Sequence, residues 1–118
     1  MKRDISIYIK DILENMQKAE KFVEGIGYTE FLNDEKTSYA VTRCIEIMGE
    51  AVKNISQEIR DKYPDIPWKR IAGMRDILIH EYFGIDLELT WKVAKEEIIE
   101  LKENILYDIK IDRRNIIQ

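Results

Sequence analysis

Cysteine, proline and glycine are scarce in this sequence, and each shortage excludes something. The single cysteine, Cys44, rules out an intrachain disulfide and a cysteine-based zinc site. With two prolines and five glycines in 118 residues, long helices are favoured over a fold of strands and tight turns. No apolar run reaches the roughly 18 residues of a membrane span, and the charged N-terminal stretch MKRDISIYIKDILEN is unlike a signal peptide. We therefore expect a cytoplasmic protein without a membrane partner.

The apolar and charged content indicates one globular domain with a heavily charged surface. Hydrophobic residues make up 45% of the chain and charged residues 36%, a balance typical of soluble proteins. A chain of 118 residues supports one hydrophobic core, and no repeat or linker divides it, so we expect residues 1–118 to form a single domain. The net charge of −4 argues against a generally basic nucleic-acid-binding coat but leaves room for a local basic patch.

Three long segments repeat their apolar residues with a 4-3-4-3 spacing, which marks one buried stripe of a helix. The first stripe comprises Ile5, Ile9, Ile12, Met16, Ala19 and Val23. The second comprises Val41, Ile45, Met48, Val52, Ile55 and Ile59. The third comprises Leu87, Trp91, Ala94, Ile98, Leu101 and Ile105. Three such helices and a shorter fourth predict an all-α fold, an antiparallel four-helix bundle.

Capping and helix-breaking residues set the expected ends of the first two long helices. A pair of glycines ends the first, and residues 28–34 are expected to form a short helix or turn. The second is expected over 35–62, with Asn33 or Asp34 as its N-cap. Pro64 ends it, because the residue before a proline is pushed out of helical geometry.

The shorter helix is expected over 68–82 or 71–82, with Gly84 as its C-terminal cap. Asp86 is the expected N-cap of the last long helix. The tail 108–118 alternates charge with isoleucine and has no clear structure, so it is expected to be a frayed end or an interaction arm.

His80, the only histidine, is expected to point away from the core. On an ideal helix of about 100° per residue, Ile71 and Met74 face the core and His80 lies about 180° from Ile71. Asp76 stands four residues earlier on nearly the same line, close enough to accept a hydrogen bond from the imidazole and fix its tautomer. The alternatives are a core histidine with satisfied nitrogens and an ordinary surface contact between the two side chains.

A second apolar strip makes this shorter helix apolar on two sides. Ala72, Ile79 and Phe83 lie at about 80° to 120° on the same helical wheel. A helix buried on two sides in a small bundle often has a second copy of the protein as its partner, beside a two-fold axis. The strip therefore predicts at least a dimer.

Arg75 and Tyr82 are seven residues apart and share one line of the same helix. Within one copy, Arg75 would splay from His80 by about 140°. A cleft between two copies, or a distorted helix end, would be needed to bring these side chains to one substrate.

A local excess of positive charge precedes and enters this helix. The bases are Arg60, Lys62, Lys69, Arg70 and Arg75, against Asp61 and Asp65, with Tyr63 and Trp68 interleaved. Basic and aromatic side chains together suit an RNA backbone and unstacked bases. We expect RNA binding by Arg60, Lys62, Lys69 and Arg70, the alternative being a solvated helix end.

Arg75, Asp76, His80 and Tyr82 form an R-x4-H-x-Y pattern with a polar residue directly after the arginine. This pattern resembles the motif of HEPN-domain ribonucleases, most closely the HepT-like toxins. The resemblance includes IEIMGEAVKNIS (45–56) and IPWKRIAGMRDILIHEYFGID (66–86), and it covers most of residues 4–106.

The resemblance implies a four-helix bundle that forms a homodimer or higher oligomer, with two copies of the motif lining a cleft at the interface. It also implies a metal-independent endoribonuclease without a cofactor, a toxin encoded beside an MntA-like nucleotidyltransferase antitoxin. That partner is expected to silence the toxin by transferring AMP onto the motif tyrosine, here Tyr82.

The residue types suit this chemistry. RNA supplies its own nucleophile, the 2′-hydroxyl, so a metal is not required. An imidazole, with an ordinary pKa of about 6.5, suits general base or acid catalysis, which assigns that role to His80. Arg75 would hold the scissile phosphate, and Asp76 would orient His80.

Two alternatives stay open. The chain is a non-catalytic nucleotide- or partner-binding subunit of a two-component nucleotidyltransferase, or a degenerate relative that only dimerises. The acidic net charge favours the first of these, whereas the intact motif and the basic segment favour the ribonuclease. Glu46 and Glu50 are one helical turn apart, but without further ligands they do not make a metal site.

Overall fold

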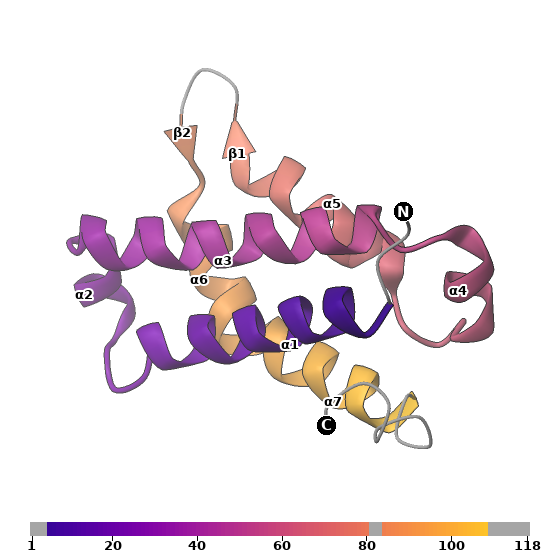
Figure 1. Cartoon of the computed structure of the whole chain (residues 1–118). Coiled ribbons are helices and arrows are strands. Elements are labelled where there is room, and N and C mark those ends of the chain that lie inside the picture. Colours follow the sequence, from indigo (N-terminus) through magenta and orange to yellow (C-terminus); the bar gives the residue numbers. More distant parts are fainter. Residues whose placement is uncertain (1–4, 81–83, 109–118) are drawn as a thin grey trace.

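The computed structural model describes residues 5–80 and 84–108, which form a bundle of helices with one short pair of strands (Figure 1). The elements are α1 (Ile5–Phe22), α2 (Tyr28–Leu32), α3 (Glu35–Lys53), α4 (Gln57–Lys62), α5 (Trp68–Leu78), β1 (Ile79–His80), β2 (Gly84–Ile85), α6 (Leu87–Lys92), the π-helical segment η1 (Val93–Glu97) and α7 (Ile98–Asp108). The predicted all-α bundle, with a short helix between the first two long ones, is confirmed.

The central element is α3, which packs against α1 on one side and α5 on the other. Figure 1 shows α1 and α3 side by side, running in opposite directions. The segments α6, η1 and α7 follow one another without a break and form the fourth long helix, which contacts α1 through α7 and α3 through α6. None of the described helices has the length and apolar character needed to cross a bilayer.

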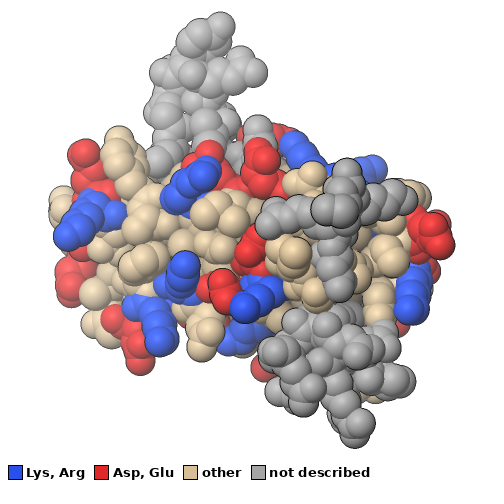
Figure 2. All heavy atoms as spheres, viewed as in Figure 1, with Lys and Arg blue, Asp and Glu red and all other residues tan. Residues whose placement is uncertain are grey.

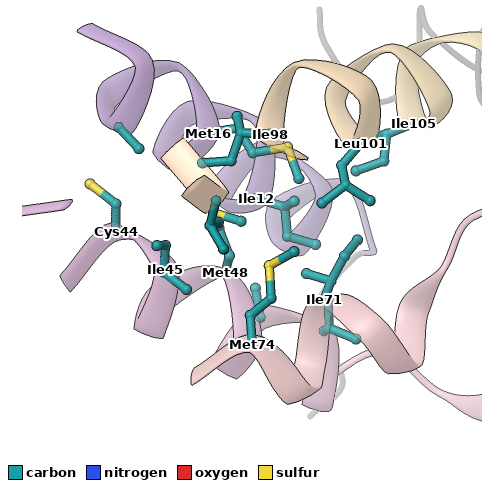
Figure 3. Packing of buried hydrophobic residues seen from close by; sticks show 14 of the residues in the cluster. Ile12, Met16, Cys44, Ile45, Met48, Ile71, Met74, Ile98, Leu101 and Ile105 are labelled. Atoms are coloured by element: carbon teal, nitrogen blue, oxygen red, sulfur yellow. The ribbon is translucent and has the colours of Figure 1, made fainter. Parts of the chain in front are cut away.

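The predicted apolar stripes form the core where these helices meet (Figure 3). Most members of the stripes are buried, and the partly buried members are Ile5, Ile59, Leu87 and Trp91. The shorter helix contributes Ile71 and Met74, as the helical wheel predicts. Among the largest fully buried side chains are Ile12, Met16, Ile45, Met48, Ile71, Ile98, Leu101 and Ile105.

Two aspartates begin the second and fourth long helices, as predicted. Asp34, rather than Asn33, is the N-cap of α3: its carboxylate accepts hydrogen bonds from the backbone N–H of Thr37 (3.0 Å) and from the Thr37 hydroxyl (2.6 Å). These hydrogen bonds to Thr37 hold the pKa of Asp34 below its ordinary value. Asp86 caps α6 by accepting from the backbone N–H of Leu89 at 3.0 Å.

The prediction of one continuous helix over 35–62 is wrong. The α3 helix ends at Lys53, and α4 begins after Ser56, whose hydroxyl accepts from the backbone N–H of Ile59 at 3.3 Å. The buried stripe nevertheless continues across the break, because Ile55 in the turn is buried and Ile59 is partly buried. A turn that keeps the same side chains inside leaves the apolar spacing of a single helix.

The prediction that the shorter helix continues to residue 82 is also wrong. The α5 helix ends at Leu78, and the next two residues pair antiparallel with β2, Ile79 opposite Ile85 and His80 opposite Gly84. Gly84 is therefore part of a strand and not the predicted helix cap. Isoleucine is β-branched and favours extended geometry, which suits Ile79 and Ile85 to the two strands.

Candidate functional site

The motif residues lie at the junction of α5 and the β1–β2 hairpin. Arg75 and Asp76 are in the last turn of α5, and His80 is in β1. Asp76 is exposed, whereas the side chains of Arg75 and His80 lie outside what the structure describes. Tyr82 and Phe83 also lie outside the described residues. The structure therefore gives the backbone path of the motif as far as His80.

This path changes the geometry expected from a helical wheel. Because α5 ends at Leu78, His80 does not stand on the helical line of Asp76. The predicted line from Arg75 to Tyr82 ends outside the described residues. The proposed helical strip that joins Ala72 to Ile79 is wrong for the same reason. Because the helix ends between Arg75 and His80, the angle of about 140° calculated for an unbroken helix does not apply to this pair. This helix end is the distorted one that the sequence left open.

The guanidinium of Arg60 is bonded to the C-terminal end of α3. It donates one hydrogen bond to the carbonyl oxygen of Val52 (2.8 Å) and one to that of Ile55 (3.1 Å). The last carbonyl groups of a helix lack partners within the helix, and a cation there is favourable for the helix dipole. Arg60 therefore acts structurally, whatever further contacts it makes.

The other bases of the predicted patch have different environments. Arg70 of α5 forms an ion pair with Glu97 of η1, and this pair joins α5 to the long helix made of α6, η1 and α7. Lys62 and Lys69 are exposed, and the ammonium of Lys62 lies 5.6 Å from the ring centre of Tyr63. Figure 2 shows basic and acidic side chains interspersed over the visible face of the bundle. The sequence cluster of bases is thus not a uniform positive surface.

The α4 region is fastened to the start of α5 through Trp68. Its ring is buried, and the indole N–H donates to the carbonyl oxygens of Tyr63 (3.0 Å) and Arg60 (3.2 Å). The Trp68 ring is therefore a core anchor and not an exposed stacking surface for bases. Together with Arg60, it fixes the entry to the helix that carries Arg75 and Asp76.

No group of histidine, cysteine, aspartate and glutamate side chains suited to a metal ion occurs among the described residues. Cys44 is a buried free thiol in α3, and burial raises its pKa, so the neutral form is favoured. Neither feature supplies an alternative catalytic centre in the described part of the chain.

Two residues near the motif were not singled out from the sequence. The sequence does not indicate Glu97, because its partner in the ion pair, Arg70, lies 27 residues earlier in the chain. Gly73, in the middle of α5, carries a signal that the sequence did contain: glycine in a helix interior is unfavourable and usually has a reason.

Comparisons with known proteins agree with the motif. The profile of the family described as "Ribonuclease HepT-like" matches residues 12–107. A Methanocaldococcus jannaschii protein whose name proposes an RNase is 51% identical over 112 residues, 92% of this chain and 93% of that protein. A Thermococcus cleftensis protein named as a probable ribonuclease HepT is 47% identical over 102 residues, 86% of this chain and 93% of its own.

A bacterial protein, from Caldanaerobacter subterraneus and also named for an RNase, is 43% identical over 98 residues, 83% of this chain and 88% of its own. No solved structure matches the chain significantly. The family match runs from residue 12 in α1 to residue 107, one residue before the end of α7, and includes the R-x4-H-x-Y segment. An all-helical bundle, the motif at a helix end and these similarities lead to one assignment: the chain belongs to the HepT-like ribonuclease family.

Proposed function

We propose that the protein is a metal-independent endoribonuclease toxin, regulated by a nucleotidyltransferase antitoxin. The observation that carries this proposal is the complete motif of Arg75, Asp76, His80 and Tyr82 in a chain of the HepT-like ribonuclease family. The end of α5 at Leu78 supports it, because the break allows Arg75 and His80 to serve one phosphodiester.

The proposed reaction uses the RNA 2′-hydroxyl as nucleophile. His80 takes the proton from this hydroxyl, whose oxygen then attacks the adjacent phosphorus. The bond from phosphorus to the 5′-oxygen breaks, and the leaving oxygen receives a proton from the imidazolium of the second copy in the cleft. Arg75 binds the phosphate and stabilises the added negative charge, while Asp76 orients the imidazole. The products are a 2′,3′-cyclic phosphate and a 5′-hydroxyl.

The RNA strand needs contacts beyond the reacting phosphate, and we assign them to the bases around α4 and α5. Lys62 and Lys69 are the principal candidates because both are exposed. Arg60 already donates to the carbonyl oxygens of Val52 and Ile55, and Arg70 is paired with Glu97. An RNA contact by either arginine would compete with these interactions or be added to them. Removal of each true phosphate contact should reduce the salt dependence of binding, by about 0.7 in slope for a single strand.

The catalytic proposal is tested with His80→Ala and Arg75→Ala. Both variants should lose RNA cleavage and keep the helical circular dichroism spectrum, because neither residue is among the described core residues. Cleavage by the wild type should persist in EDTA and leave a 2′,3′-cyclic phosphate. Undiminished cleavage by His80→Ala contradicts the mechanism, and a variant that does not fold returns the histidine to a structural role.

The composite site requires a homodimer, formed where α5 and the hairpin of one copy meet those of another. Ala72, half-buried on α5, is the described member of the apolar surface that supports this proposal. Sedimentation at micromolar concentration should give at least a dimer, and Phe83→Glu should weaken it. A monomer that cleaves RNA at the normal rate would rule out the composite cleft.

The proposed regulation is transfer of AMP to the hydroxyl of Tyr82 by an MntA-like nucleotidyltransferase, with release of pyrophosphate from ATP. The adduct carries a negative phosphate that competes with RNA for Arg75. Mass spectrometry after incubation with the transferase and ATP should place AMP on Tyr82. Tyr82→Phe should stay an active nuclease that the transferase does not silence. Full protection of cells that carry Tyr82→Phe would contradict this regulation.

The alternative is a non-catalytic nucleotide- or partner-binding subunit of a two-component nucleotidyltransferase. The observations that favour it are the net charge of −4 and the internal partners of Arg60 and Arg70, which reduce the positive surface available to RNA. Under this alternative, purified wild type binds the transferase but cleaves no RNA, with or without the transferase. The same cleavage assay therefore separates the two functions.

A further inference from the structure

Gly73 occupies a helix position that the described part of the chain does not require to be glycine. It lies in the interior of the 11-residue α5, and it is not among the described residues with a positive φ, of which Gly25 is the one example. A Cβ built on Gly73 meets no described atom within 4 Å outside its own helix backbone and chain neighbours. Neither backbone conformation nor packing among the described residues explains the glycine.

The glycine is also costly. Glycine in a helix interior is less stable than alanine by about 0.5–1 kcal/mol. An alanine here would have room, so the lost stability is not recovered inside the described bundle. A bare Cα also lets another molecule approach the backbone of α5 closely.

The position of Gly73 indicates what approaches. On an ideal helix it lies about 160° from buried Ile71 and about 100° from buried Met74, and it precedes Asp76 by one helical turn, or about 4.5 Å along the axis. The residues one turn earlier, Lys69 and Arg70, are both exposed and basic. The bare position thus lies between two bases and the proposed catalytic residues.

We propose that Gly73 is a substrate-positioning residue, whose missing side chain lets an RNA strand lie against α5 and brings its phosphodiester to Arg75. This inference rests on the proposed ribonuclease function. A neighbouring phosphate of the strand lies near Lys69, whose exposed ammonium attracts it. A second protein copy is the less favoured occupant, because the centres of protein interfaces are depleted of charged residues and charged residues surround this position.

The experiment compares Gly73→Ala with wild type and with the control Gly27→Ser. Gly27 also faces open space among the described atoms, and its φ of −97° and ψ of 174° suit a serine N-cap for α2, so both variants should raise the Tm. RNA affinity is measured with a labelled single-stranded RNA of mixed sequence carrying 2′-fluoro groups. This probe lacks the hydroxyl nucleophile, so binding is measured independently of cleavage.

We expect Gly73→Ala to be more stable, to self-associate as the wild type does, and to bind the probe more weakly by about tenfold or more, as for an overpacked contact. On cleavable RNA it should lose activity in the same proportion, while Gly27→Ser loses neither. Unchanged affinity for the probe overturns the proposal. Altered self-association with an unchanged RNA affinity per dimer also overturns it and assigns the contact at Gly73 to a second copy. A fall in Tm overturns it too and assigns the contact to packing within the chain. If wild type binds the probe but cleaves nothing, the ribonuclease proposal fails while the Gly73 result stands on its own.

Discussion

Replacement of Arg60 tests whether this residue is a structural clamp, as its hydrogen bonds indicate. Its guanidinium donates to the carbonyl oxygen of Val52, in the last turn of α3, at 2.8 Å and to that of Ile55, just after α3, at 3.1 Å. A hydrogen bond that involves a charged group contributes about 1.5–3 kcal/mol when buried. Because Arg60 is only half-buried, we take about 1 kcal/mol for each bond, the value for an ordinary hydrogen bond.

Arg60→Ala should therefore lower the free energy of unfolding by about 2 kcal/mol, which corresponds to a fall in Tm of roughly 6–10 °C for a chain of this size. Urea denaturation followed by circular dichroism measures it. Arg60→Lys should recover less than half of the loss, because an ammonium keeps the favourable charge at the helix end but lacks the planar fork. Lys62→Ala is the matched control on the same short helix, exposed and expected to change stability by less than about 0.5 kcal/mol.

The reasoning is refuted if Arg60→Ala unfolds within about 0.5 kcal/mol of wild type, the range of an ordinary surface substitution. RNA binding supplies a second, independent comparison. If Arg60 instead contacts phosphate, its removal lowers the slope of log affinity against log salt by about 0.7 and leaves the Tm unchanged. If Arg60 is a structural clamp, Arg60→Ala lowers the Tm and leaves the salt slope unchanged, provided that the RNA affinity is calculated for the folded fraction of the protein.

Three further predictions concern the core, the α3 cap and the buried thiol. Leu101 is 1% exposed, so Leu101→Ala should lower the free energy of unfolding in urea by about 2–5 kcal/mol. Ile99, two residues earlier, is 46% exposed, and Ile99→Ala should lower it by less than about 0.5 kcal/mol. Equal losses would contradict the assigned core face of α7. Asp34→Ala should lower the Tm at neutral pH, because the ionised carboxylate accepts the hydrogen bonds from Thr37 that lower its pKa. The difference in Tm from wild type should shrink as the pH falls below 3.8, because the carboxylate becomes protonated. A difference in Tm that is independent of pH would contradict a role for these hydrogen bonds. Cys44 should react slowly with a thiol reagent at pH 8 in native protein and quickly in urea, because burial raises its pKa, and rapid native reaction would show that the thiol is accessible.

The sequence predicts the bundle because burial repeats with the period of the helix. Ile9, Ile12 and Met16 in α1, and Ile98, Leu101 and Ile105 in α7, are buried as their spacing requires. The same signal cannot locate the break between α3 and α4, because Ile55 remains buried in the turn that joins them. The apolar spacing reports which side chains are buried, and both a continuous helix and a turn can place the side chain of Ile55 in the core.

The end of α5 was unpredictable for a different reason. The helical wheel treats Ile77, Leu78 and Ile79 as a helical continuation, although isoleucine favours strands at least as well. The hairpin depends on pairing with Gly84 and Ile85, a contact that no local pattern specifies. Tertiary pairing therefore decides the backbone around His80.

The candidate RNA surface shows what a count of charges leaves out. Arg60 and Arg70 carry the same charge in the sequence as Lys62 and Lys69, but their partners are carbonyl oxygens of α3 and Glu97 of η1. These partners come from other helices, so only the folded chain identifies them. The motif itself was recognisable from the sequence because its residue types and spacing are what the chemistry uses.

The π-helical segment has a consequence for comparing chains of this family. At Val93–Glu97, the backbone N–H of Ile98 bonds to the carbonyl of Val93, five residues back, so this turn holds one residue more than an α-helical turn. Loss of that residue would turn η1 into ordinary α-helix and leave both ends of the fourth helix seated on the same core. Sequence alignments of related chains should accordingly accept a one-residue gap between 93 and 97, inside a helix, where gaps are usually penalised. A natural variant shortened at this point would preserve the bundle but lose or shift Glu97, and with it the ion pair to Arg70.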